Sequence, residues 1–213
     1  MKRFVVLFII LAFVKAVQSQ TGYIPREGDL LFQVAGDTEF SDAIANATAV
    51  SDSVKFVHVA MVVLDSEVPH VIEAVDGKGV ISTPLEDFLS SSHKMNGKPG
   101  VVAMRVNMDF PVSDAVSRAK SHLGEDYDWS FMPDNGKMYC SELIYESYRN
   151  ADGTPIFTAR PMNFRDSSGN IPDFWVNLFN KMNQPVPEGV LGTNPHDMSK
   201  DPVLLEVYRF FMP

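Results

Sequence analysis

Residues 56 to 64, Phe-Val-His-Val-Ala-Met-Val-Val-Leu, form an apolar segment with one ionisable residue, His58. Apolar side chains stand at odd and even positions alike, which is the pattern of a β-strand buried on both faces of its sheet. Burying an ionisable group without a partner is costly. The segment therefore predicts a central strand and requires a polar partner for His58.

Other segments of strand length surround this one. Four further runs are expected to form strands, at residues 29–34, 70–75, 101–106 and 203–210. Helices are expected at four places: from a capping box at Thr83-Pro84-Leu85-Glu86 to about Leu89, from Ser113 to Gly124, and over 139–149 and 172–182. Residues 183–201, rich in Gly, Pro, Asn and Asp, predict a long ordered loop. This mixture predicts an α+β domain with a mainly antiparallel sheet.

The first 19 residues have the pattern of an export signal. Lys2 and Arg3 precede an apolar run over 4–14, and small or tolerated residues ending at Ser19 supply a cleavage point. The run is too short to cross a bilayer, which needs roughly 20 residues. We expect residues 1–19 to be removed and residues 20–213 to form a single domain without an integral membrane segment.

The net charge of the chain limits the classes of partner that it can bind. The formal net charge is -9, and loss of Lys2, Arg3 and Lys15 with the signal would leave -9 - 3 = -12. A strongly acidic surface argues against nucleic acid and anionic membranes as partners. A small peptide or amide remains compatible with this charge, and no cofactor is expected.

Glu73 is the partner expected for His58. It interrupts the next apolar segment, residues 70 to 75, His-Val-Ile-Glu-Ala-Val. If the two strands form a hairpin whose turn is centred on residues 65 and 66, position 58 lies opposite 73 on the same face. A shift of one residue would place the two side chains on opposite faces.

Cys140, the only cysteine, completes a set of reactive groups. It cannot form a disulfide within the chain, and it stands where a polar turn becomes a helix. A helix N-terminus and a neighbouring imidazolium both favour the thiolate, which is the nucleophilic form. A thiolate beside a histidine that a carboxylate orients is the arrangement of a cysteine hydrolase, with the backbone N–H of Cys140 as an oxyanion donor.

A zinc site is the chemical alternative. His58, His70 and Glu73 could lie near one another, and His196-Asp197 could add ligands. The assumed hairpin sends His70 to the other face of the sheet, which leaves too few ligands. No metal is therefore expected.

The order of these motifs resembles a known family. Gly28-Asp29-Leu30-Leu31-Phe32, Val57-His58-Val59-Ala60, Val71-Ile72-Glu73-Ala74, Gly79-Val80 and Tyr139-Cys140-Ser141-Glu142-Leu143-Ile144-Tyr145 are similar to the YiiX and YaeF group of circularly permuted papain-like, NlpC-related enzymes. In ordinary NlpC proteins the cysteine precedes the histidine, whereas here the histidine strand comes first.

The resemblance implies a fold, a site and an activity. It implies a mainly antiparallel sheet packed against a helix with the cysteine at its N-terminus, and Cys140, His58 and Glu73 as the catalytic residues. Tyr127 is similar to a family tyrosine that lines the site, and either Tyr127 or Tyr139 is expected to contact the substrate or the oxyanion. The implied function is that of an exported amidase or peptidase, acting on cell-wall peptides or related amides in a bacterial periplasm or outside the cell. Two alternatives stay open: a lipid-handling acyltransferase or thioesterase of the same superfamily, and a non-catalytic module that binds cell-wall peptide.

Overall fold

A six-stranded antiparallel sheet forms the centre of the molecule, in the order β10-β7-β1-β2-β3-β4. The computed structural model describes residues 22–48 and 54–212, so the predicted signal at 1–19 lies outside the described residues. The sheet consists of β1 (Leu30–Val34), β2 (Phe56–Val63), β3 (His70–Val75), β4 (Gly79–Pro84), β7 (Val101–Val106) and β10 (Leu204–Arg209). Two small antiparallel pairs lie outside it: β5 (Lys94–Met95) with β6 (Lys98–Pro99), and β8 (Arg160–Pro161) with β9 (Leu191–Gly192).

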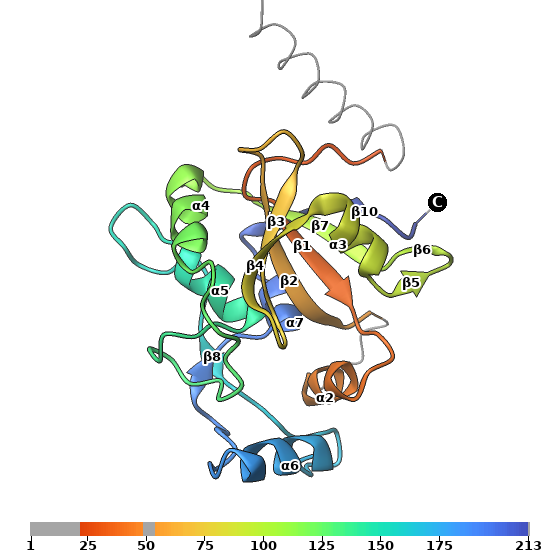
Figure 1. The fold of residues 1–213 in the computed structure, drawn as a ribbon, viewed down its shortest axis with the longest axis vertical. Helices are drawn as coiled ribbons and strands as arrows, with labels where there is room; N and C mark the ends of the chain where they lie inside the picture. The colour runs from red at the N-terminus through yellow and green to blue at the C-terminus, as the bar shows by residue number, and fades with distance from the viewer. Residues whose placement is uncertain (1–21, 49–53, 213) are drawn as a thin grey trace, which may run out of the picture.

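Helices surround the sheet (Figure 1). They are α2 (Glu39–Ala47), α3 (Leu85–Ser91), α4 (Val112–Ser121), α5 (Cys140–Ser147), α6 (Asp173–Lys181) and α7 (Pro195–Ser199). Helix α5 packs against α4 and against strands β2 and β3, while α2 packs against α6 and against β2. Within the described ranges, none of the helices has the length and apolarity needed to cross a membrane.

The central strands are buried on both faces, as the apolar pattern predicts. Leu30, Phe32, Val59, Met61 and Ile72 belong to the cluster that contains α5. Their neighbours in sequence, among them Leu31, Ala60, Val62 and Val71, belong to a second cluster that contains α3. The predicted α+β class with a mainly antiparallel sheet is confirmed.

The structure adds elements that the sequence patterns did not reveal. Strand β4 and helix α2 were not predicted, and β9 and α7 lie inside the stretch expected to be a loop. The capping box at Thr83 is wrong: Thr83 belongs to β4, Pro84 is the N-cap of α3, and no side chain caps that helix. The Thr83 hydroxyl is engaged with Glu73 instead, because a strand places it on the same face as that carboxylate.

The β2–β3 register differs from the predicted one by two residues. The observed pairs are Met61↔Ile72, Val62↔Val71 and Val63↔His70, so His58 is not directly opposite Glu73. Because side chains alternate with a period of two, a two-residue shift keeps His58 and Glu73 on one face. The ladder ends at Met61, so the two strands carry these side chains where they are no longer hydrogen-bonded to each other.

The backbone at the start of β4 requires a glycine at position 79, one of the motif residues. Its φ is +74°, a conformation that favours glycine, and a Cβ there would lie 2.0 Å from the backbone oxygen of Glu125. This close approach lets the Val80 N–H donate to the Glu125 oxygen at 2.8 Å. The Gly124 N–H donates to the Val80 oxygen at 2.9 Å. Gly79 thereby fixes the segment that leads into Tyr127.

Candidate active site

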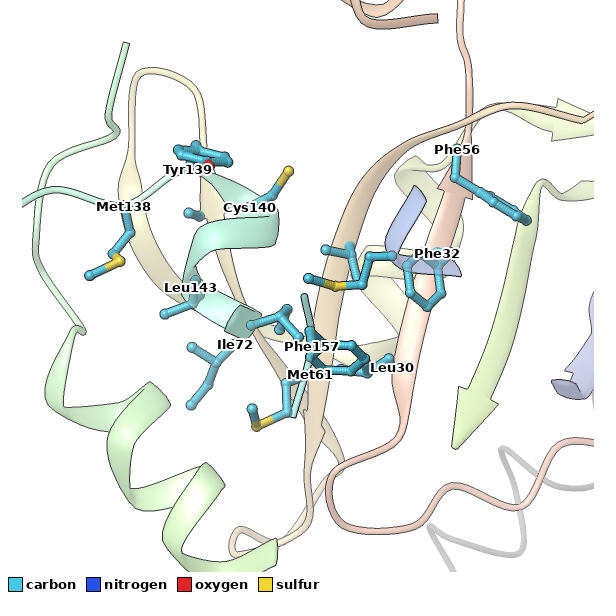
Figure 2. Close-up of a cluster of buried hydrophobic side chains, with 14 of the residues drawn as sticks. Leu30, Phe32, Phe56, Met61, Ile72, Met138, Tyr139, Cys140, Leu143 and Phe157 are labelled. Atoms are coloured by element: carbon cyan, nitrogen blue, oxygen red, sulfur yellow. The ribbon is translucent and has the colours of Figure 1, made fainter. Parts of the chain in front are cut away.

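Cys140 is the first residue of α5 and is 4% exposed. Leu143 and Ile144 bury the helix against the sheet, and Figure 2 shows the sulfur of Cys140 directed away from Leu143 and Ile72. The N–H groups of the first helical turn have no partner within the helix, so the amide of Cys140 is available to a ligand. The thiol thus stands at the positive end of the helix dipole.

His58 has neighbours from both layers that cover the sheet. Its ring lies 6.1 Å from the ring of Phe88 on α3, and Cys140 on α5 is close enough to raise its pKa. Its Nε2 lies 2.7 Å from Oε2 of Glu73. Because Glu73 occupies Nε2, Nδ1 is the ring nitrogen left to face the thiol.

Glu73 is fixed by a second hydrogen bond. The Thr83 hydroxyl donates to its other oxygen, Oε1, at 2.6 Å, and the carboxylate is 8% exposed. Thr83 is the orienting residue that sequence reasoning missed, since its side chain was assigned to a helix cap. Only the pairing of β3 with β4, in which Glu73 faces Ile81, places the hydroxyl within reach.

The electrostatics of the pair favour a charged histidine. Burial alone would lower the pKa of His58, but its hydrogen bonds to Cys140 and Glu73 and their negative charges outweigh burial and raise the pKa to about 10. Burial acts to raise the pKa of Glu73, yet the hydrogen bond and charge of His58, together with Thr83, hold it below its ordinary value. These shifts support a charged His58 imidazolium beside the Glu73 carboxylate.

Tyr127 lies beside the thiol because two backbone hydrogen bonds join its segment to the start of α5. Asp128 donates its N–H to Met138, and Met138 donates to Asp126. Burial, followed by the charge of Cys140, raises the pKa of the Tyr127 hydroxyl well above its ordinary value, so it remains protonated as a donor. Across residues 22–48 and 54–212 this hydroxyl has no hydrogen-bond partner.

The hydroxyl of Tyr139 is already engaged. It accepts from the backbone N–H of Thr193 at 3.1 Å and donates to the sulfur of Met162 at 3.9 Å. Thr193 also donates its side-chain hydroxyl to Ser141 at 3.0 Å. These contacts join the residues that follow strands β8 and β9 to the start of α5. Tyr139 and Thr193 are more than fifty residues apart in sequence, so no local pattern predicts their contact.

A cleft that opens to solvent leads to Cys140. Tyr127, Tyr139 and Cys140 line it, with residues from α2, the 157–164 segment and α7. Both tyrosines named from the sequence therefore border the cleft, and the hydroxyl of Tyr139 is the one bonded to Thr193.

The structure does not assemble the alternative zinc site. His70 contacts Ser66 and Val68 at the far end of β3, and His196 packs beside Phe56. Within the part of the chain that the structure describes, no group of three His, Cys, Asp or Glu side chains is placed to hold a metal ion.

The chain is similar to known proteins. Residues 24–208 match the family model described as permuted papain-like amidase enzyme, YaeF/YiiX, C92 family. Over 135 residues the chain is 34% identical to the uncharacterized protein YiiX of Escherichia coli K12, a match that covers 62% of this chain and 61% of that protein. It thus spans less than two thirds of the relative's length.

A solved structure is also similar. The crystal structure described as that of metalloprotein YiiX from Escherichia coli O157:H7 superimposes with a TM-score of 0.71 at 26% identity. The superposition covers 88% of this chain and 98% of that one.

Proposed function

Because the chain belongs to the permuted papain-like amidases of the YaeF/YiiX, C92 family, a family of cysteine hydrolases, we propose that it cleaves an amide bond through a covalent Cys140 intermediate. The single observation that carries the proposal is the 2.7 Å contact of His58 Nε2 with Glu73, on a ring whose pKa is also raised by Cys140. In this proposal Cys140 of α5, His58 of β2 and Glu73 of β3 act together in proton transfer.

The proposed reaction has two stages. The thiolate of Cys140 attacks the carbonyl carbon, and the oxyanion accepts hydrogen bonds from the Cys140 backbone N–H and the Tyr127 hydroxyl. As the C–N bond breaks, His58 gives its proton to the leaving amine, which leaves an acyl thioester. Water then attacks the thioester, His58 takes its proton, and the carboxylic acid and the thiolate are released. Glu73 and Thr83 hold the ring in the required tautomer throughout.

No step of this mechanism passes through a metal ion. The related crystal structure is described as a metalloprotein, but a catalytic zinc site needs about three protein ligands and an open position. The described residues of this chain offer no such group, since Glu73 is committed to His58 and Thr83.

Selective alkylation tests the proposal directly. Iodoacetamide at near-neutral pH should label Cys140 in the wild type, much more slowly in His58→Ala, and not at all in Cys140→Ala. His70→Ala is the matched control, since His70 lies away from the thiol, and it should label like the wild type. Equal labelling of the wild type and His58→Ala would show that the two side chains do not cooperate.

The substrate we propose is a cell-wall peptide or a related amide, met in the periplasm or outside a bacterial cell. The signal pattern at residues 1–19 supports export, and sequencing of the N-terminus of protein recovered from the periplasm tests it. A screen of muropeptides and amino-acid amides against the wild type and Cys140→Ala tests the substrate. Turnover by Cys140→Ala would overturn the mechanism.

Acyl transfer is the second candidate, and the largely apolar cleft beside Cys140 favours it because such a cleft retains an acyl group. Product formed in water alone indicates hydrolysis. A requirement for an added amine or alcohol indicates transfer.

A further inference from the structure

One residue outside α5 is hydrogen-bonded to the residues on both sides of Cys140. The backbone N–H of Thr193 donates to the hydroxyl of Tyr139 at 3.1 Å, and its side-chain hydroxyl donates to the hydroxyl of Ser141 at 3.0 Å. Tyr139 and Ser141 are buried, and Figure 2 shows Tyr139 next to Cys140 at the start of α5. Thr193 therefore holds the start of the helix at two points.

The start of α5 has little support of its own. Its N-cap is Tyr139, which lacks the short side-chain oxygen with which Ser, Thr, Asn or Asp caps a helix. The Glu142 carboxylate accepts from the Tyr139 N–H, but at 3.4 Å this bond is longer than is typical. Because helix ends fray, the contacts with Thr193 should restrict the movement of Cys140.

Thr193 is itself fixed on both sides along the chain. Gly192, before it, belongs to β9, and a Cβ there would lie 2.9 Å from the Tyr139 hydroxyl, so glycine permits the close approach. Asn194, after it, caps α7, where its side-chain oxygen accepts from the N–H of Asp197 at 2.8 Å. The two donor groups of Thr193 therefore belong to a backbone that is held from both ends.

The same segment also contacts the strand of the histidine. Helix α7 packs against β2, which bears His58, and against α5. The N–H of Phe56, at the start of β2, donates to Nδ1 of His196 on α7 at 3.5 Å. Residues 192–198 thus connect the element that carries the nucleophile with the element that carries the base.

We propose, on the basis of the proposed function, that Thr193 is a positioning residue for Cys140. Through Tyr139 and Ser141 it fixes the first turn of α5 relative to His58, and with this turn the sulfur and the backbone N–H that donates to the oxyanion. It acts through its neighbours and takes no part in proton transfer. Small displacements of such a site are costly, because a shift of about 1 Å can reduce a rate roughly a hundredfold.

Thr193→Val tests this role, because valine has nearly the shape of threonine but cannot donate to Ser141. Alkylation of Cys140 by iodoacetamide at pH 7 should slow about fivefold to tenfold, and kcat for an amide should fall about tenfold while KM changes less than about twofold. Tm should fall by only about 2–4 °C, the loss expected for one hydrogen bond in a chain of this size. A lower Tm with unchanged alkylation and kcat would assign Thr193 to stability alone and overturn the proposal.

Further variants show whether the bond itself matters. Ser141→Ala removes its other end and should slow alkylation as Thr193→Val does, while the double variant should be no slower than either single one. Ser141→Ala also carries the test if Thr193→Val does not fold. Thr193→Ser keeps the hydroxyl and should react within about twofold of the wild type. If the effects of Thr193→Val and Ser141→Ala multiply in the double variant, the two side chains act independently and the proposal fails.

Ser92→Ala is the matched control for Ser141→Ala. Ser92 is also buried, but its hydroxyl donates to the Leu89 oxygen of α3 at 2.7 Å. This variant therefore loses a buried hydrogen bond without a change at α5, and its alkylation rate should equal that of the wild type. Slower alkylation of Ser92→Ala, to the same extent as Ser141→Ala, would show a general loss of stability and overturn the positioning role.

The alkylation rate separates this proposal from the proposed function, because it does not depend on any substrate. If the wild type cleaves no amide but Thr193→Val is alkylated about fivefold more slowly, the positioning role stands and the hydrolase fails. If amides are cleaved and Thr193→Val matches the wild type in alkylation and in kcat, the positioning role fails and the hydrolase stands.

Discussion

At the scale of single residues, the protonation of His58 is the property on which the proposed chemistry depends. Glu73 and Cys140 both raise its pKa, to about 10, against the effect of burial. Glu73→Gln keeps an oxygen near Nε2 but removes the charge, so the imidazolium should lose its proton at a lower pH. Nitrogen-15 NMR of the histidine ring should show this titration moving to lower pH in Glu73→Gln and in Cys140→Ala.

The exposed Glu67 supplies the control for that measurement. Glu67→Gln lies in the β2–β3 turn and should leave the titration unchanged. The alkaline limb of kcat/KM should move to lower pH together with the NMR titration in Glu73→Gln. A wild-type His58 that is neutral at pH 7 would contradict the ion pair.

The two tyrosines of the cleft should respond differently to loss of the hydroxyl. Tyr127→Phe removes a donor that has no partner among the described residues, so kcat should fall about tenfold to a hundredfold with little change in Tm. Tyr139→Phe leaves the Thr193 N–H without its acceptor, which should reduce the unfolding free energy by about 1–3 kcal/mol. Kinetics and thermal unfolding of both variants, compared side by side, check this division. The reverse pattern would assign the oxyanion contact to Tyr139.

At the scale of elements, the site depends on close contacts between backbone segments. Gly79→Ala would force a Cβ against the Glu125 oxygen at a φ of +74°, and it should lower the unfolding free energy by more than about 3 kcal/mol. Gly77→Ala is the matched control, because its φ of +70° imposes similar strain while no atom lies within 4 Å of the added Cβ. It should lower stability by only about 1–2 kcal/mol in urea unfolding. Equal losses would show that conformational strain, and not the contact with Glu125, explains Gly79.

Elements with a strong local pattern were the ones the sequence predicted. The buried strands and the helix that begins near Cys140 follow from apolar periodicity, and the His58–Glu73 contact follows from side-chain alternation even though the register was wrong. Thr83 and Thr193 escaped prediction because their partners come from other elements, whose positions depend on packing. Helix α2 was missed because small residues, Ala43 and Ala45, form much of its buried face.

At the scale of the whole molecule, buried acidic groups should make stability depend on pH. Burial, and then the charge of Asp128, raises the pKa of Glu142 to about 8. The folded protein therefore binds more protons than the unfolded chain between about pH 4.5 and pH 8, and its stability falls as pH rises through this range. The raised pKa of His58 acts in the same direction: its contribution is full below about pH 6.5 and is lost as pH rises through about 10.

Glu142→Gln tests the larger part of this effect. The amide keeps an acceptor for the Tyr139 N–H but cannot ionise. Urea unfolding should show the variant close to the wild type at pH 5 and more stable at pH 8.5, by up to roughly 4 kcal/mol. Glu86 is an exposed carboxylate on α3, so Glu86→Gln should show no such gain in stability between pH 5 and pH 8.5. A wild-type stability that rises from pH 5 to pH 8.5 would contradict the assignment.

The order of the chain has a consequence for biosynthesis. The histidine strand and its glutamate leave the ribosome well before the helix that bears the thiol, and α5 packs against β2 and β3. In the proposed mechanism, the nascent chain therefore contains the base His58 and its partner Glu73 before the nucleophile Cys140 has been synthesised. The proposed catalytic site is complete only after most of the domain has been translated.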